Sequence, residues 1–167
     1  MQLVEVIFLY DELIHDIEAN INNIERKATV PAGSPAGQPL LPNGAKSDYL
    51  IARHIDTAIN QAVSRCQAYL LLPSPYVHRI STDHAHQWEE KSLYLALPPD
   101  WPPHCIDPLR DAVHNYIVYR TMQLYLAFTD PQAAATADAM ATDCYDDINV
   151  QINTRRSPLS CGYSPFG

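Results

Sequence analysis

Residues 107–153 read DPLRDAVHNYIVYRTMQLYLAFTDPQAAATADAMATDCYDDINVQIN, and this stretch decides the fold. Each half opens on aspartate followed by proline, at Asp107-Pro108 and again at Asp130-Pro131. A carboxylate can accept hydrogen bonds from the first helical amides, and the fixed φ of proline suits the first turn. The break between the halves is only two or three residues long. We therefore predict two helices, about 107–128 and 131–153, packed as an antiparallel hairpin.

The first helix of this hairpin is apolar nearly all round. Its apolar residues are Leu109, Ala112, Val113, Tyr116, Ile117, Val118, Tyr119, Met122, Leu124, Tyr125, Leu126 and Ala127. A helix of this kind is central in its own domain, or a neighbouring subunit buries its second side. The second helix is rich in alanine, which favours helix and lets backbones approach closely.

Two further helices are predicted upstream. Residues 3–28 carry two rows of apolar residues that each repeat every seven: Leu3, Tyr10, Ile17 and Ile24, and Ile7, Ile14, Ile21 and Ala28. Both rows lie on one face of a helix, which is typical of a bundle helix or of a coiled-coil seam to another chain. We favour packing within the subunit, because the later helices need a partner. Ser47 or Asp48 caps the other helix, which extends to about Leu72.

The segments between these helices are of two kinds. Residues 29–46 hold so many prolines and glycines that they predict a long loop, either a solvated insertion without a role or a contact loop. Residues 76–80 and 93–97 read as short strands that could pair as a hairpin, although the first could also be loop. Residues 98–103 predict a stiff polyproline-type connector, with Trp101 as its anchor.

The last residues, from Thr154, form a polar tail with no core of their own. Two arginines and two aromatic residues give this tail groups that can bind elsewhere, and an arginine pair commonly docks on an acidic protein surface. The sequence therefore predicts a mainly α fold: a small helical bundle with a short β-hairpin or extended middle segment. Residues 1–153 form one helical domain with the 29–46 loop inserted, and residues 154–167 form an extended C-terminal docking arm.

The net charge of −8 argues against a general nucleic-acid or membrane-surface binder, because phosphate attraction needs clustered lysine and arginine. Four widely spaced cysteines favour free thiols and a reducing compartment. No apolar stretch is long enough to predict a spanning helix, and the N-terminal residues do not resemble a signal peptide.

No established catalytic motif is present in the chain. His84 and His86 lie in a polar stretch, where solvated histidines are more common than the rigid ligand sets that metals need. Glu89 and Glu90 are adjacent and would point apart, which does not suit the paired carboxylates of a glycosidase. We therefore expect no catalytic residue, no cofactor and no metal.

One resemblance covers residues 47–167. The segment DAVHNYIVYR at 111–120 follows LPPD at 97–100 and precedes a Thr-Asp-Pro break and an alanine-rich helix. This order resembles the head-to-tail connector proteins of tailed bacteriophages, also called adaptor, head-completion or tail-accessory proteins. The sequence departs from them in its long 29–46 loop and its long first helix.

The resemblance implies a structural virion protein, not an enzyme. It would form a ring, commonly of twelve subunits, between the portal protein and a downstream tail protein. DNA would pass through this ring without sequence-specific binding, and assembly would take place in the cytoplasm of the bacterial host. The docking arm would bind the portal or a neighbouring subunit through Arg155, Arg156, Pro158, Leu159, Tyr163 and Phe166. Subunits would pack through Tyr116, Tyr119, Arg120 and Tyr125.

Two alternatives remain from the sequence. Some connectors of short-tailed phages are reported to hydrolyse the cell wall, so the resemblance also admits a phage-associated hydrolase, although no catalytic residue maps onto this chain. The helical pattern alone would also suit a helical-bundle interaction module with no viral role.

Overall fold

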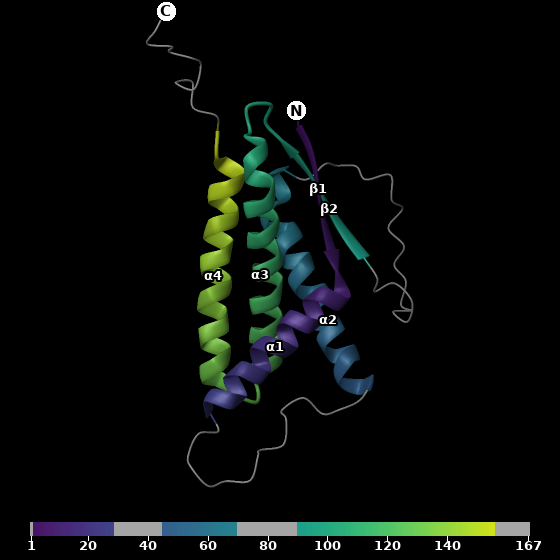
Figure 1. Ribbon diagram of the computed structural model, residues 1–167, viewed down its shortest axis with the longest axis vertical. Coiled ribbons are helices and arrows are strands. Elements are labelled where there is room, and N and C mark those ends of the chain that lie inside the picture. The colour runs from purple at the N-terminus through teal and green to yellow at the C-terminus, as the bar shows by residue number, and fades with distance from the viewer. Residues whose placement is uncertain (1, 29–44, 70–89, 156–167) are drawn as a thin grey trace, which may run out of the picture.

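The computed structural model describes residues 2–28, 45–69 and 90–155, and these form four helices and a two-stranded antiparallel sheet, as the mainly α prediction requires. The elements are β1 (Gln2–Leu9), α1 (Tyr10–Ala28), α2 (Ala45–Arg65), β2 (Glu90–Leu97), α3 (Ile106–Leu126) and α4 (Pro131–Asn153), with short 3₁₀ turns at Gln67–Tyr69 and Pro103–Cys105. Helices α3 and α4 run side by side along the molecule, and the sheet lies on the other flank of α3 (Figure 1).

The α3–α4 hairpin confirms the helix starts with one correction. Asp130 caps α4, since its Oδ1 accepts a hydrogen bond from the Ala133 amide at 3.0 Å. Helix α3 begins earlier than predicted, because the 3₁₀ turn at Pro103–Cys105 runs directly into it. Its N-cap is therefore Cys105, and Asp107 lies within the first turn, where a negative charge still favours the helix dipole.

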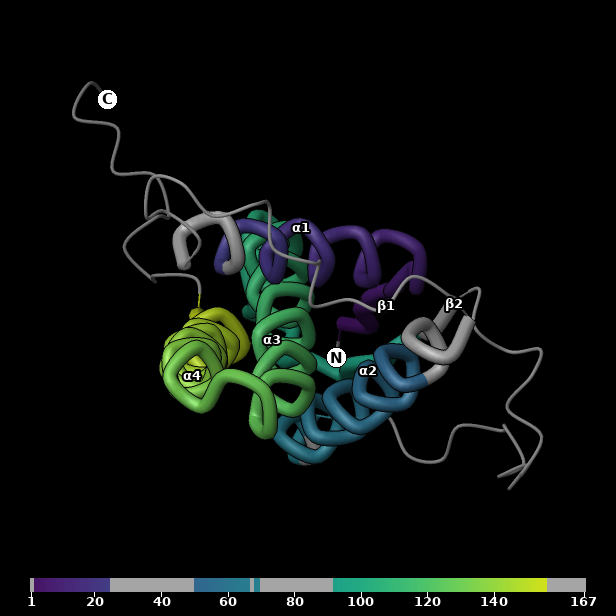
Figure 2. Tube along the Cα trace, turned by 90° about the horizontal axis from the view of Figure 1, so that it is seen from below, coloured from purple at the N-terminus to yellow at the C-terminus, as the bar shows by residue number. Residues whose placement is uncertain are grey.

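Helix α3 is the centre of the bundle. It contacts α4, α2, α1 and β1, and the tube in Figure 2 shows it between α4 on one side and α1, α2 and the sheet on the other. The alanines Ala134, Ala137 and Ala141 of α4 are buried and allow this close approach. The sequence left open whether this helix is buried within its own domain or by a neighbouring subunit. In the structure, other parts of the same chain cover most of its surface.

The prediction of one helix over residues 3–28 is wrong at its start. Residues 2–9 form strand β1, with Val4, Val6 and Phe8 buried and the alternate side chains exposed. This period-2 pattern in a run rich in β-branched residues is that of a half-buried strand. The heptad rows hold only from Tyr10 onward, whereas Leu3 and Ile7 face outward.

Tyr10 marks the corner where β1 turns into α1. Its ring is buried, and its hydroxyl donates a 2.5 Å hydrogen bond to Asp56 Oδ1 of α2. Burial first, and then this bond to a carboxylate, raise the pKa of the phenol above its ordinary value. The corner is therefore fastened to α2 by a side chain that stays protonated.

The strand predicted at 93–97 is confirmed within β2, but its partner is β1. The strands are antiparallel, with Leu3 opposite Ala96 and Ile7 opposite Ser92. The other candidate strand, 76–80, lies outside the described residues. So does the 29–46 loop, except for its last two residues, which already belong to α2.

Helix α2 differs from its predicted bounds at both ends. It begins at Ala45, two residues before the expected cap, and its last helical residue is Arg65. A 3₁₀ turn at Gln67–Tyr69 follows, with the Tyr69 amide bonded to the Cys66 carbonyl at 2.9 Å. The predicted extension of the helix to Leu72 is therefore wrong at Gln67–Tyr69, because these residues form a 3₁₀ turn.

Trp101 is the anchor that the connector 98–103 was predicted to hold. The chain after β2 makes a tight turn, with the Trp101 amide bonded to the Pro98 carbonyl at 3.0 Å. The indole is fully buried, and its Nε1 donates to the Gln151 carbonyl at 2.8 Å. The connector is thus a turn locked onto α4, and not only a stiff polyproline spacer.

Thr121 is a buried residue of α3, and its substitution tests the packing of the core. Its side chain is 0 % exposed, and its Oγ1 has no hydrogen-bond partner among the residues that the structure describes. A buried hydroxyl without a partner carries a desolvation penalty, so Thr121→Val should stabilise the protein by about 1 kcal/mol. Urea unfolding followed by circular dichroism measures this change.

Thr142 provides the matched control for that experiment. It is exposed on α4, and its hydroxyl donates to the Asp138 carbonyl at 2.9 Å. Thr142→Val should change stability by no more than about 0.5 kcal/mol. A Thr121→Val protein that is less stable than the wild type would mean that the hydroxyl has a partner after all.

Cys66 lies at the buried end of α2, and burial raises the pKa of its thiol to about 11. Only on the order of 0.1 % of it is thiolate at pH 8, against about a quarter for a thiol of ordinary pKa. We expect Cys66 in the native protein to react with iodoacetamide at least about 100-fold more slowly than in urea. Peptide mass spectrometry resolves each cysteine, and equal native and denatured rates at Cys66 would contradict its placement.

Candidate functional site

The end of α4 is fastened to the turn that follows β2. Arg155 Nη1 donates to the carbonyls of Ile152 and Thr154, at 2.9 Å each, and Arg155 Nε lies 3.8 Å from Asp100 Oδ2. An arginine on the last carbonyls satisfies groups that a helix end leaves open. Together with the bond from Trp101 to Gln151, these contacts form what we call the C-terminal junction.

The junction includes Arg155, one of the residues predicted to bind through the arm. Its side chain contacts the last carbonyls of α4 and lies near Asp100, and 35 % of it is exposed. Thr154 has extended backbone angles, φ −63° and ψ 137°, so the helix stops there. The other predicted arm residues, Arg156, Pro158, Leu159, Tyr163 and Phe166, lie outside the described residues.

The residues predicted for subunit packing contact their own chain. Tyr116 is buried in the core. Arg120 bonds Gln61 of α2 at 2.7 Å and Asp138 of α4 at 2.8 Å, so it joins three helices. Tyr119 and Tyr125 are partly buried against the same core. Tyr116 and Arg120 are thereby occupied within the monomer, whereas Tyr119 also lines a surface groove.

This groove, which we call the apolar groove, lies between α1, α3 and α4. It has a volume of about 490 Å³ and is lined by Asn20, Asn23, Ile24, Tyr119, Met122, Ala133, Thr136, Ala137 and Met140. Its lining is mostly apolar, with the amides of Asn20 and Asn23 and the hydroxyls of Tyr119 and Thr136, and none of these lining residues is charged. Such a groove suits apolar side chains better than a small charged ligand.

A second apolar surface, the outer sheet face, lies on β1. Leu3, Ile7 and Leu9 are 61 %, 46 % and 42 % exposed. They alternate with the buried residues of the strand, so they form one row, and Glu5 is the charged member of that row. The sequence prediction missed this surface, although the alternation within residues 3–9 could have revealed it.

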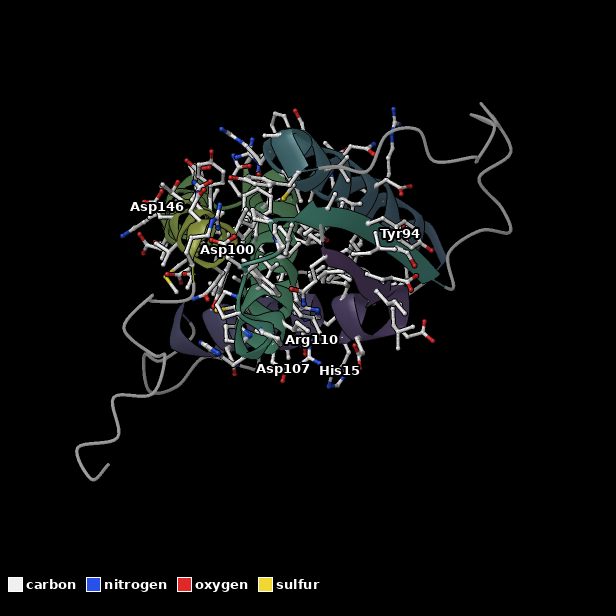
Figure 3. All side chains as sticks on the ribbon, turned by 90° about the horizontal axis from the view of Figure 1, so that it is seen from above. His15, Tyr94, Asp100, Asp107, Arg110 and Asp146 are labelled. Carbon is white, nitrogen blue, oxygen red and sulfur yellow. The ribbon has the colours of Figure 1, made fainter. Side chains whose placement is uncertain are left out.

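A polar groove of about 780 Å³ runs between β1, α1 and α3. It is lined by Ile7, Phe8, Asp11, Glu12, His15, Asp16, Arg110, Asp111 and His114. His114 Nε2 lies 2.8 Å from Asp16 Oδ2, which joins α3 to α1. Figure 3 shows His15, Asp107 and Arg110 on this same side of the molecule.

Arg110, which lines this groove, is paired with two acidic side chains. Arg110 lies 3.0 Å from Asp111 and 3.4 Å from Asp107. Its hydrogen bond and attraction to Asp111 raise the pKa of the guanidinium further above its ordinary value. Within the described ranges, no group of three or more His, Cys, Asp or Glu side chains is placed to hold a metal ion.

Most of the residues weighed for chemistry in the sequence lie outside the part of the chain that the structure describes. His84, His86 and Glu89 lie outside the described residues, and Glu90 belongs to β2. His104 is exposed in the 3₁₀ turn before α3. Among the helices that the structure describes, none has the length and apolar character needed to cross a bilayer.

Comparisons of the chain with protein-family models, with curated proteins and with solved structures found no match.

Proposed function

We propose that this protein is a subunit of the head-to-tail connector of a tailed bacteriophage, forming a ring beneath the portal protein. In this role it joins the capsid to the tail and lines the channel through which DNA leaves. The role is structural and not enzymatic.

The C-terminal junction is the observation that carries the proposal. The LPPD step at 97–100 and the last turn of α4 are distant in sequence, yet Trp101 and Arg155 bind them into one unit. Where a chain segment begins at a rigid junction, its first residues are held in a fixed position relative to the helical domain. This is what a docking arm needs if it is to reach a fixed place on a larger ring.

The charge supports the same role. The net charge is −8, and the acidic residues along α4, such as Asp143, Asp146 and Asp147, give this helix a surface that repels DNA phosphates. A channel wall must let DNA slide, so weak contact with phosphate is an advantage there. The ring wall is therefore a better fit for this surface than a DNA-packaging or DNA-condensing role.

The decisive experiment is portal binding by the full chain and by a chain that lacks residues 156–167. We expect the full chain to bind the portal of the same phage as a ring in electron micrographs, and the truncated chain to bind at least about 100-fold more weakly. Arg155 is retained, so its contacts with α4 and Asp100 persist and helicity by circular dichroism should not change.

A chain in which residues 156–167 are replaced by glycine and serine at the same length is the matched control. It should bind as weakly as the truncated chain, because the proposal assigns affinity to these side chains and not to chain length. A full-length protein that stays monomeric and ignores the portal would overturn the connector role.

The non-enzymatic part of the proposal has its own test. We expect no clearing when the protein is run at high load in a gel that contains peptidoglycan. Clearing that survives purification of the recombinant chain would establish the hydrolase alternative instead.

A further inference from the structure

We propose that the outer sheet face of one copy packs into the apolar groove of the next copy, and that this contact builds the ring. The inference rests on the proposed connector function for the ring itself, and adds which surfaces meet. It assigns a role to the outer sheet face and the apolar groove, which the other described residues of the chain leave exposed.

The first argument is the pairing of shapes and chemistry. The sheet face presents a single row of aliphatic side chains, Leu3, Ile7 and Leu9, with Glu5 among them. The groove offers a mostly apolar lining with the adaptable side chain of Met140, which is 41 % exposed. The side-chain amides that line the groove can donate hydrogen bonds to Glu5, the one carboxylate in the row.

The second argument is electrostatic. Copies of a chain with a net charge of −8 repel one another, so they approach most easily where acidic side chains are scarce. The groove is lined by no charged residue, and the strand row carries Glu5 alone. By contrast, the exposed face of α4 is acidic and would oppose a second copy, whereas the acidic polar groove adjoins the row only at Ile7.

The third argument is the placement of the two surfaces on the molecule. The sheet and α4 lie on opposite flanks of α3 in both ribbon and tube views (Figures 1 and 2). A contact between two different surfaces is heterologous, and repeating it adds copies in one direction until the rotation closes a ring. A contact between two sheet faces would be isologous and would stop at a dimer.

The size of the contact sets its expected strength. An eight-residue strand is about 26 Å long, so one face of two strands supplies only part of the ~800 Å² per partner of a stable interface. We therefore expect weak pairwise association, with a ring held because every subunit makes the contact twice. The test uses high protein concentration, or the portal complex, for this reason.

Cross-linking of cysteine variants tests the contact directly, in a background in which Cys144 and Cys161 are serine. Ile7→Cys protein mixed with Met140→Cys protein should give a dimer with a short bismaleimide, and a chain with both substitutions should give a ladder. Neither single variant should cross-link to itself, because each contributes only one half of the contact. Val150→Cys, 60 % exposed on α4 outside the groove, is the matched control and should not cross-link to Ile7→Cys.

Two results would overturn the inference. One is dimer formation by Ile7→Cys alone, which would show an isologous sheet contact. The other is the absence of a cross-linked product from Ile7→Cys and Met140→Cys proteins that micrographs show as a portal-bound ring. The connector function would then stand without this interface. A mixed-pair product from a protein that never binds the portal would have the opposite meaning, since the interface would stand and the connector function would fail.

A surface substitution adds a second readout. Ile7→Lys should lower the apparent assembly constant, measured by sedimentation, at least about 10-fold, whereas Val150→Lys should leave it unchanged. Equal assembly by both lysine variants, with wild-type melting temperatures, would also count against the contact.

Discussion

Val6→Lys should destabilise the protein by at least about 3 kcal/mol, whereas Ile7→Lys should change its stability by less than about 0.5 kcal/mol. Val6 is buried on the inner face of β1, where a lysine ammonium would have no partner among the apolar side chains of the core. Ile7 is on the outer face of the same strand and is 46 % exposed, so a lysine there reaches water.

This pair of substitutions distinguishes a strand from a helix at the start of the chain. A helix with the heptad pattern would bury Ile7 and expose Val6, and the two effects would be reversed. Urea denaturation monitored at 222 nm gives both free energies, with Glu5→Lys as a further control on the exposed face. Comparable losses for the lysines at positions 6 and 7 would contradict the register of β1.

Trp101→Ala should destabilise the protein by about 4 kcal/mol, the range measured for large aromatic side chains removed from well-packed cores. The indole is fully buried among the helices, and its N–H satisfies the Gln151 carbonyl near the end of α4. Alanine would leave a cavity at the junction and remove the indole hydrogen bond, so that the Gln151 carbonyl would keep only its bond from the Thr154 amide at 3.3 Å. The same change should loosen the origin of the arm.

Trp101→Phe separates the two contributions of the indole. The ring of phenylalanine fills most of the space, while the hydrogen bond to the Gln151 carbonyl is lost, so we expect a loss of about 1–2 kcal/mol. Thermal unfolding gives the stabilities, and amide hydrogen exchange at residues 150–155 reports on the junction. If alanine and phenylalanine destabilise equally, the cavity is not the larger contribution and the packing described here is wrong.

The hairpin of α3 and α4 could be predicted because its signals are local. Asp130 and Pro131 are adjacent in sequence and mark the start of α4 within its own first turn. The alanines of α4 and the short break needed no knowledge of distant residues. The start of α3 shifted, because the 3₁₀ turn ahead of it supplies a start that the aspartate-proline signal does not encode. Its end also comes earlier than predicted, at Leu126 and not at about residue 128.

Strand β1 could not be predicted with the same security because two periods fit its residues. Positions 3 and 7 continue the heptad rows of α1 backward, while positions 4, 6 and 8 alternate as a strand requires. What decides between them is pairing with β2, a contact between distant parts of the chain. Tertiary pairing of this kind overrides a local helical pattern.

The surfaces proposed for assembly were missed for a related reason. The resemblance implied a subunit contact at Tyr116 and Arg120, and a sequence does not show that α1, α2 and α4 contact α3 and cover it. The exposed apolar residues include Leu3, Ile7 and Leu9 of β1 and Met140 beside the groove, together with Phe128 and Val150 elsewhere. Their exposure follows from which elements pack together, which is a property of the whole fold.

The pairing of β1 with β2 also has a consequence for synthesis. Leu9 of β1 is opposite Glu90 of β2, so the first strand leaves the ribosome well before its partner has been translated. At a translation rate of about 5–20 residues per second, the valines and Phe8 of β1 stay exposed to water for several seconds before β2 is synthesised. Closing the sheet over two intervening helices is a non-local step and hence a slow one. We expect the nascent chain to be a client of ribosome-associated chaperones until residue 97 has emerged.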